Sequence, residues 1–267
     1  MAVPPPDESA RAFFAFHLKR LREQRKLSQP DLGRMVHVSA SLISGIENCA
    51  RTPGLVLSKA LDAALGVPHF FEALHPRLLE ETGLPAGFTE FADAEAEAST
   101  LKMYENFVIT GLFQTEEYAR VVLQANERPD KIDHLVATRV ERQELLYGED
   151  PPMVIALLDE FAVRRPFGGR EVMEKQYTHL LHLAQKPRAS LHIVPADAEI
   201  CPEGAFEILS FPESPPVGYV ESAGGRGQLI EMGRHVAQLD VLFEIIRNKA
   251  LSAADSERFI HDLLEAL

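Results

Sequence analysis

The chain has 267 residues, of which 46% are hydrophobic and 25% are charged, as in a globular protein with a proper core. No apolar stretch approaches the roughly 20 residues that a membrane-spanning helix needs, and Met1 to Pro6 lack the features of a secretory signal. The two cysteines, Cys49 and Cys201, are too few for a disulfide framework, so we expect a protein of the reducing cytoplasm.

Charge is distributed unevenly along the chain, whose net charge is −13. Residues 1–76 carry 9 Lys and Arg against 7 Asp and Glu, a charge of +2, whereas residues 77–267 carry 18 against 33, a charge of −15. This asymmetry favours a front part that faces nucleic acid and a back part that faces solvent or a partner. Because +2 is only mildly basic, we expect modest DNA affinity for one copy and a contribution from dimerisation.

Short helices are predicted at the start of the chain. The first spans Ser9 to Lys26, with an apolar stripe and with basic residues that we expect to be solvated. Ser28, with Asp31 three residues later, predicts a capped second helix that ends at Met35 and buries Met35 itself.

A third helix follows after a tight turn. The turn is expected at His37-Val38, and Ser39 predicts the cap of a helix that runs to about Asn48. Its apolar residues are expected to face the core, and its polar residues, Glu47 included, to face outward. Two short helices joined in this way are typical of a helix-turn-helix, which lays its second helix in the DNA major groove.

The candidate DNA-binding residues lie at helix N-termini and on the outward side of the third helix. They are Ser28, Gln29, Ser39, Ala40, Ser41, Ser44, Asn48 and Arg51. Gln29 can donate to a phosphate, because helix N-termini direct N–H groups toward anions. The third helix offers only short side chains to base edges, so sequence discrimination would also use DNA shape. A solvated cap residue at Gln29 and a surface ion pair at Arg51 remain alternatives.

The rest of the chain predicts a second domain of a different class. Helices are expected from Leu55 to Gly66 and on to His75, followed by alternating strands and helices that begin near Tyr104. The segment Phe107 to Phe113 is expected to be core. We predict a mainly α helix-turn-helix domain at residues 1–76, a connector at 77–103, and an α+β domain at 104–267. Its sheet is expected to be mixed with flanking helices, because the last three strands are linked too tightly for helical crossovers.

Chemically reactive residues form no convincing catalytic or metal set. Asp159 and Glu160 follow a strand, but we expect them to cap a helix or to pair with a following arginine. His179 and His182 are three residues apart on a helix, with no third ligand in place. Cys49 is expected to be a buried, inert thiol. We therefore expect no enzyme activity, no metal and no cofactor.

Two known families resemble this chain. Residues 10–75 resemble the lambda-repressor-like (XRE-type) helix-turn-helix, and the second half resembles the uncharacterised C-terminal domain of actinobacterial WhiJ-like regulators. The first resemblance is carried by LSQ at Leu27 to Gln29, VS at Val38-Ser39, IS.IE at Ile43 to Glu47, and R.P at Arg51 to Pro53. The second is carried by ITGLFQTEEYAR (Ile109 to Arg120), R..RQ.LL (Arg139 to Leu146), LLDEFAVRRPFGG (Leu157 to Gly169) and YVES (Tyr219 to Ser222). Many XRE-type relatives place Arg or Lys after the capping Ser, where this chain has Ala40-Ser41. The resemblance also implies an alternative for Glu47, since in this family the Glu at that position often packs or bonds internally.

The resemblance implies a transcriptional regulator of development and antibiotic production, whose gene often neighbours one for a small acidic partner protein. We predict a sequence-specific regulator that binds double-stranded DNA as a homodimer. Its C-terminal domain is expected to dimerise, or to receive a small acidic protein or another effector. An antitoxin-like module with autoregulatory DNA binding, and an enzyme targeted to DNA, remain alternatives.

Overall fold

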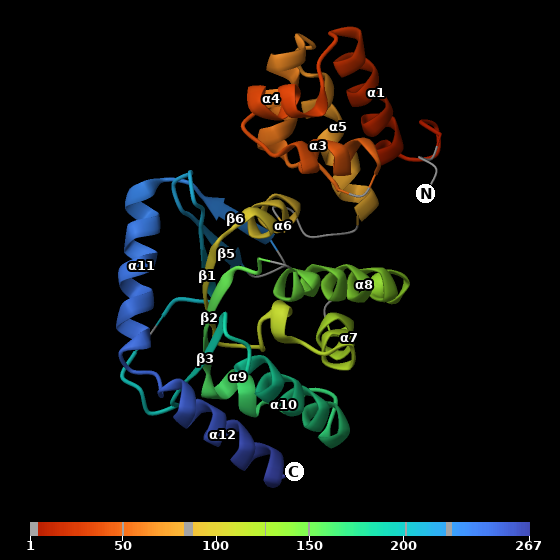
Figure 1. Ribbon diagram of the computed structural model, residues 1–267. Helices are drawn as coiled ribbons and strands as arrows, with labels where there is room; N and C mark the ends of the chain where they lie inside the picture. The colour runs from red at the N-terminus through yellow and green to blue at the C-terminus, as the bar shows by residue number, and fades with distance from the viewer. Residues whose placement is uncertain are drawn as a thin grey trace. The chain divides into compact units, whose positions relative to one another are not determined.

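The computed structural model divides the chain into two compact units, Met1–Asp93 and Ala94–Leu267 (Figure 1). It describes residues 5–49, 51–82, 88–125, 127–148, 150–200, 202–222 and 226–267. None of the described helices is long and apolar enough to cross a membrane. The division predicted from the sequence, with a domain at residues 1–76, a connector at 77–103 and a domain at 104–267, stays a prediction. The helix α6 (Phe88–Glu97) contains the point at which the two units meet along the chain.

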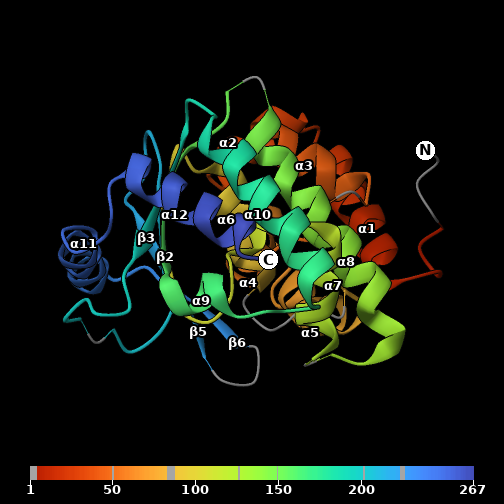
Figure 2. The ribbon, with the colours of Figure 1, turned by 90° about the horizontal axis from the view of Figure 1, so that it is seen from below.

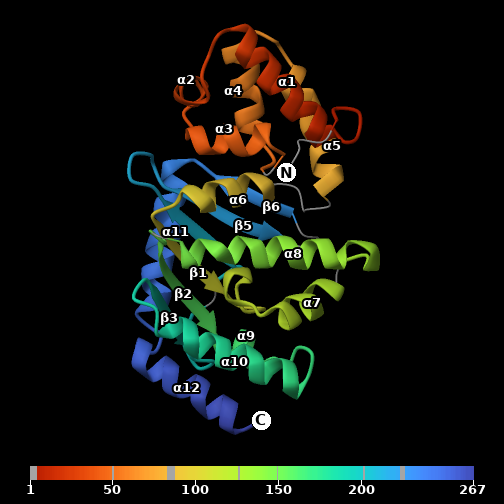
Figure 3. The ribbon, with the colours of Figure 1, turned by 45° about the vertical axis from the view of Figure 1, so that its right-hand side comes forward.

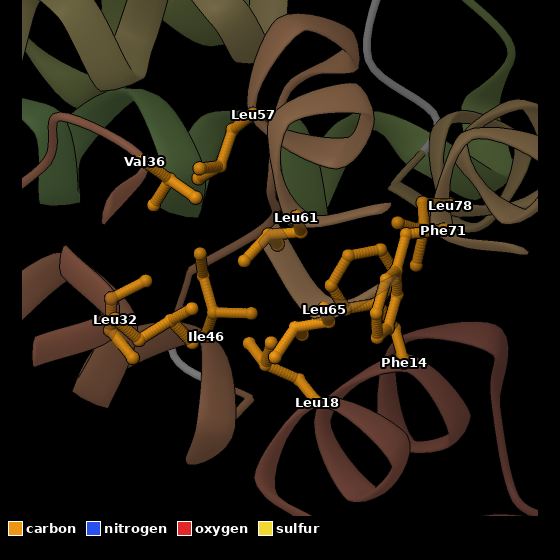
Figure 4. Packing of buried hydrophobic residues seen from close by; sticks show 11 residues of the cluster. Phe14, Leu18, Leu32, Val36, Ile46, Leu57, Leu61, Leu65, Phe71 and Leu78 are labelled. Atoms are coloured by element: carbon orange, nitrogen blue, oxygen red, sulfur yellow. The ribbon is translucent and has the colours of Figure 1, made fainter. Parts of the chain in front are cut away.

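The N-terminal unit is helical. Its elements before α6 are α1 (Ala10–Gln24), α2 (Gln29–Met35), α3 (Ala40–Glu47), α4 (Leu55–Leu65) and α5 (Phe70–Thr82). Each of these helices contributes buried apolar side chains to one core. Figure 4 labels ten of them: Phe14, Leu18, Leu32, Val36, Ile46, Leu57, Leu61, Leu65, Phe71 and Leu78. Burying a side chain of this size contributes about 1.5–3 kcal/mol, so this cluster sets how the short helices pack.

One expectation about α2 and one about α5 were wrong. Met35 is 49% exposed rather than buried, because Val36, the residue after α2, takes the inward position at 6% exposure. The fifth helix was expected to end at His75, but α5 continues through Pro76 to Thr82. Leu78, beyond the proline, is buried in the core, and this burial offsets the backbone hydrogen bond that proline cannot donate.

The C-terminal unit contains a six-stranded mixed sheet of order β3-β2-β1-β4-β5-β6. The strands are β1 (Thr100–Glu105), β2 (Met153–Asp159), β3 (Ala189–Val194), β4 (Phe206–Ser210), β5 (Val217–Ser222) and β6 (Arg226–Ile230). β1, β2 and β3 are parallel and are joined by helical crossovers, whereas β4, β5 and β6 are antiparallel and are joined by short loops. The predicted α+β class with a mixed sheet is confirmed.

Helices cover both faces of this sheet (Figures 1 and 2). α11 (Gly233–Arg247) lies on one face, where Phe243 and Ile246 pack against Tyr104 and Phe206. The other face carries α7 (Glu116–Gln124), α8 (Ile132–Arg142), α9 (Glu160–Arg164) and α10 (Arg170–Ala184). The C-terminal helix α12 (Ala253–Glu265) packs against α10 and β3.

The apolar segment from Phe107 to Phe113 is mostly core, as expected. Ile109, Leu112 and Phe113 are fully buried, and a short 3-10 helix, η1 (Gly111–Phe113), shapes the end of the segment. Phe107 differs, because it is 63% exposed and lies against the guanidinium of Arg165, 5.3 Å from its ring centre. A cation–π contact of this kind tolerates an exposed aromatic ring.

Candidate nucleic-acid interface

A capping box begins α2, the first helix of the helix-turn-helix. The hydroxyl of Ser28 accepts a hydrogen bond from the backbone N–H of Asp31 (3.2 Å), and the Asp31 carboxylate accepts one from the backbone N–H of Ser28 (3.0 Å). Hydrogen bonds from Ser28 lower the pKa of the Asp31 carboxyl, and Arg34 adds to this effect. The predicted cap is confirmed, and it fixes where α2 begins.

The turn between α2 and α3 depends on two backbone constraints. A Cβ at Gly33 would lie 2.6 Å from the carbonyl oxygen of Val38, so only glycine fits there without a shift of the backbone. His37 has a φ of 57°, in the left-handed region, which reverses the chain direction. Ser39 then accepts a hydrogen bond from the backbone N–H of Leu42 (3.1 Å), and α3 begins at Ala40.

The polar side of α3 is accessible. The candidate residues on or beside this helix are Ser39, Ala40, Ser41, Ser44, Asn48 and Arg51. Ala40 and Ser44 are half-buried, and the other four are exposed. The amide of Asn48 donates to the Ser44 hydroxyl (3.3 Å), which links two candidate residues one turn apart. The side chain of Arg51 folds over Gly45, where its Cγ lies 2.7 Å from the position that a Cβ would occupy.

Gln29 is held in place by a neighbour on α3. It is half-buried, and its amide Nε2 donates to Oε2 of Glu47 (2.8 Å). An amide nitrogen carries two donors, so a second N–H can reach a phosphate oxygen from the same position. The contact with Glu47 therefore orients Gln29 without using up its donor capacity.

Glu47 does not face outward, contrary to the expectation from its position on the helix and in agreement with the alternative that the resemblance implies. It is 3% exposed and accepts two hydrogen bonds from Arg22, from Nε to Oε1 (2.6 Å) and from Nη2 to Oε2 (2.9 Å). The hydrogen bond to Glu47 raises the pKa of Arg22, which stays charged. The last turn of α3 packs toward α1, and a carboxylate buried there requires a cationic partner.

The buried role of Arg22 was not expected from the sequence, since the basic residues of the first helix were expected to be solvated. Arg22 is 8% exposed and also donates to the backbone carbonyl of Leu27 (2.8 Å). The spacing contained a signal, since Phe14, Leu18 and Arg22 follow one another at four-residue intervals on one helix face. A cation on a buried face predicts a buried anion elsewhere in the same domain.

Asp159 and Glu160 have the structural roles that were expected. Asp159 caps α9 by accepting a hydrogen bond from the backbone N–H of Phe161 (2.9 Å). Glu160 pairs with Arg164 and also accepts from the backbone N–H of Ala196 (2.9 Å). Both carboxylates therefore stabilise the connection after β2.

The remaining reactive residues form no metal set in the part of the chain that the structure describes. His179 and His182 lie on α10, and no three described His, Cys, Asp or Glu residues come together as a metal set. Cys49 is half-buried beside the carbonyl of Arg11, and burial raises the pKa of its thiol. Cys201 lies outside the described residues.

The N-terminal geometry defines a class of protein. A capped helix, a tight turn and a second helix with an accessible polar side form a helix-turn-helix, so the chain is a DNA-binding regulator. Comparison with known families agrees, since residues 14–74 match the model of a helix-turn-helix domain.

Residues 88–262 match the model described as "Domain of unknown function (DUF5753)". Because this match covers more than half of the chain, the chain belongs to the DUF5753 family. No curated protein and no solved structure matches it.

Proposed function

We propose that this chain is a sequence-specific transcriptional regulator of the XRE type, which binds double-stranded DNA as a homodimer and receives an effector on its C-terminal domain. One observation carries the proposal: the exposed polar side of α3 is anchored from behind by the buried pair of Arg22 and Glu47. A recognition helix needs both properties, since its side chains must reach the groove and its axis must stay fixed.

In this proposal α3 enters the major groove. Ser41 and Ser44 face base edges, while Gln29 and Arg51 contact phosphates on either side. The serines are short and form few specific contacts, so part of the discrimination comes from DNA shape. The N-terminal part, with a charge of +2 over residues 1–76, contributes phosphate attraction that weakens with salt.

A homodimer would place two copies of α3 about 34 Å apart, one helical turn of DNA, on a near-palindromic site. The C-terminal domain, with its excess of acidic residues, is the part proposed to dimerise or to receive a small acidic protein or another effector. The resemblance to WhiJ-like regulators supports this role. Binding of an effector there would change the equilibrium between DNA-binding and non-binding arrangements of the dimer.

The test is selection of binding sites from a random double-stranded DNA library with the full chain, followed by affinity measurements over a salt series. We expect an enriched site with two half-sites about 10 base pairs apart, and affinity that falls steeply with salt. Sedimentation of the complex gives the number of chains for each site.

Two substitutions form a matched pair, one a test and the other its control. Arg51→Ala is expected to weaken binding, whereas Arg188→Ala, which removes an exposed arginine of the C-terminal unit, is expected to leave affinity unchanged. Absence of an enriched sequence, or equal affinity of the two variants, would contradict the proposal. Enrichment of a single half-site bound by one chain would contradict the homodimer alone.

A further inference from the structure

Six charged side chains of the C-terminal unit interact on the sheet face opposite α11. This Glu207 cluster consists of Glu95, Glu105, Glu207, Glu221, Arg139 and Arg142. Glu207 is paired in register with Met103 of β1 and Tyr219 of β5. Because side chains alternate along a strand, Glu105 and Glu221 project from the same face as Glu207. Figure 3 shows α8, which carries both arginines, lying across this face.

Part of the cluster is fully paired within the protein. Arg142 donates two hydrogen bonds to Glu95 (2.6 and 3.2 Å), and Arg139 donates to the side-chain oxygen of Gln114 (2.8 Å). The amide of Gln143 donates to the backbone carbonyls of Gly111 and Gln114 (2.9 and 2.7 Å). These contacts fix α8 and the segment around η1 in front of the sheet.

Glu207 is the exception. It is 8% exposed, and its buried Oε2 accepts no hydrogen bond from any residue that the structure describes. Its pKa is raised well above the ordinary value, by burial first and then by Glu95 and Glu105. Burial followed by Glu221 raises the pKa of Glu105 to about 8, against the opposing effects of Arg139 and Arg142. A buried carboxylate without a partner is costly, so its presence points to a missing donor.

The charges of the cluster indicate what kind of donor Oε2 of Glu207 lacks. Arg142, which pairs with Glu95, also acts on Glu105 and Glu207, and Arg139 acts on Glu105 and Glu221, so four carboxyl groups share two guanidinium groups. Because the pKa values of Glu105 and Glu207 are raised, both carboxyls hold a proton at neutral pH, and a bound cation would replace these protons and stabilise the ionised carboxylates. Among the described residues no three carboxylates, histidines or cysteines are close enough for a metal ion, whose oxygen ligands must lie within about 2.0–2.6 Å. A primary ammonium group is a cation that carboxyl groups can hold without forming a metal set, since it offers three N–H donors to their oxygens.

Solvent reaches the cluster through its outer members. Glu105 and Arg139 are half-buried and Glu221 is exposed, whereas Glu207 lies deeper. We propose that the Glu207 cluster binds a small organic cation with a primary ammonium group, held by Glu105, Glu207 and Glu221. This ligand gives a chemical class to the effector of the C-terminal domain, and its regulatory meaning rests on the proposed function.

The test uses the full chain without DNA at pH 7. Thermal unfolding and calorimetry are measured with ethylammonium chloride and 1,4-diaminobutane as probes, against sodium chloride and 1,4-butanediol. We expect both ammonium probes to raise Tm saturably, while the diol and the sodium salt have no comparable effect. Calorimetry in two buffers of different ionisation enthalpy should show proton release, since a bound cation favours the ionised carboxylates.

Variants separate the site from general effects of charge. Glu207→Gln should weaken probe binding by about tenfold or more while raising the Tm of the free protein, because a neutral amide replaces a buried carboxyl of the same shape. Glu105→Gln should also weaken binding. Glu174→Gln, which removes an exposed carboxylate on α10, should bind as the unmodified chain does.

A response to ammonium no larger than that to sodium, or equal binding by the Glu207→Gln variant, would overturn the site. DNA affinity is measured separately on the free chain. Loss of DNA binding with intact probe binding contradicts the proposed function and leaves the site in place, and the reverse result contradicts the site alone.

Discussion

The guanidinium of Arg22 in α1 and the carboxylate of Glu47 at the end of α3 form a buried, two-point ion pair 25 residues apart in the chain. Glu47 also accepts from Gln29 of α2, and Arg22 also donates to the carbonyl of Leu27. One pair of charges therefore connects α1, the start of α2 and the end of α3. Planar, two-point contacts of this kind fix orientation as well as distance.

Removing one partner of this pair should destabilise the N-terminal unit. Arg22→Ala leaves Glu47 buried without its cation, which costs about 3–5 kcal/mol. Hydrogen exchange at the amides of α1 and α3 in the full chain measures this local loss. Arg34→Ala provides the control, because its exposed ion pair with Asp31 contributes at most about 1 kcal/mol. Equal protection of these amides in the two variants would show that the buried pair contributes no more to stability than the exposed pair does.

Gly45→Ala should separate DNA affinity from stability. A methyl group there meets Cγ of Arg51 at 2.7 Å, so the arginine must move off α3, while alanine favours the helix by up to about 1 kcal/mol. We expect an unchanged or slightly raised Tm, with weaker DNA binding and a salt slope smaller by about 1 if Arg51 contacts a phosphate. In the double variant with Arg51→Ala the two losses should not add. Additive losses would show that Gly45 acts independently of Arg51.

Gly227→Ala should destabilise the C-terminal unit. Tyr219 is 5% exposed and its phenol lies over Gly227 on the neighbouring strand, where a Cβ would overlap the hydroxyl and the ring. A rigid, buried ring cannot move aside, so we expect a loss of about 2 kcal/mol or more in the free energy of unfolding. Urea unfolding measures it. Gly204→Ala, with nothing within 4 Å of its Cβ position, should stay within about 0.5 kcal/mol, and a similar cost at both positions would refute the steric explanation.

Stability of the C-terminal unit should fall as pH rises from about 4.5 to about 8. Glu105 has its pKa raised from the ordinary 4.5 to about 8, so in this range the folded state holds a proton that the unfolded state has lost. The stabilisation by this proton is therefore complete below the pKa of Glu105 in the unfolded chain, and it is lost as the pH rises to the pKa in the folded chain. Between the two, the free energy of unfolding falls by at most about 1.4 kcal/mol per pH unit for one proton. Glu207, whose pKa is also raised, acts in the same direction.

Glu105→Gln should reduce the change in the free energy of unfolding with pH, and it should stabilise the C-terminal unit above pH 8. The measurement is urea unfolding across the pH series for both proteins, with Glu174→Gln as a control for the loss of an exposed carboxylate. Parallel curves for the Glu105→Gln variant and the unmodified chain would show that Glu105 is ionised in the folded state at neutral pH.

The sequence by itself determined the local features of this protein. Ser28 with Asp31, the turn at His37-Val38 and the cap at Ser39 lie within a few residues of the atoms that they bond, so the helix-turn-helix was predictable to within a residue or two. The mixed character of the sheet was predictable as well, because linker lengths decide whether strands can be parallel.

Only the tertiary structure decided which charges are buried and with which partners. Glu47 was expected to face outward and Arg22 to be solvated, since a pattern along one helix does not identify a partner 25 residues away. The Glu207 cluster is a stronger case, because α6, β1, β4, β5 and α8 bring together carboxyl and guanidinium groups from five separate stretches of chain. Burial makes such charges interact strongly, and burial depends on packing between distant segments rather than on local sequence.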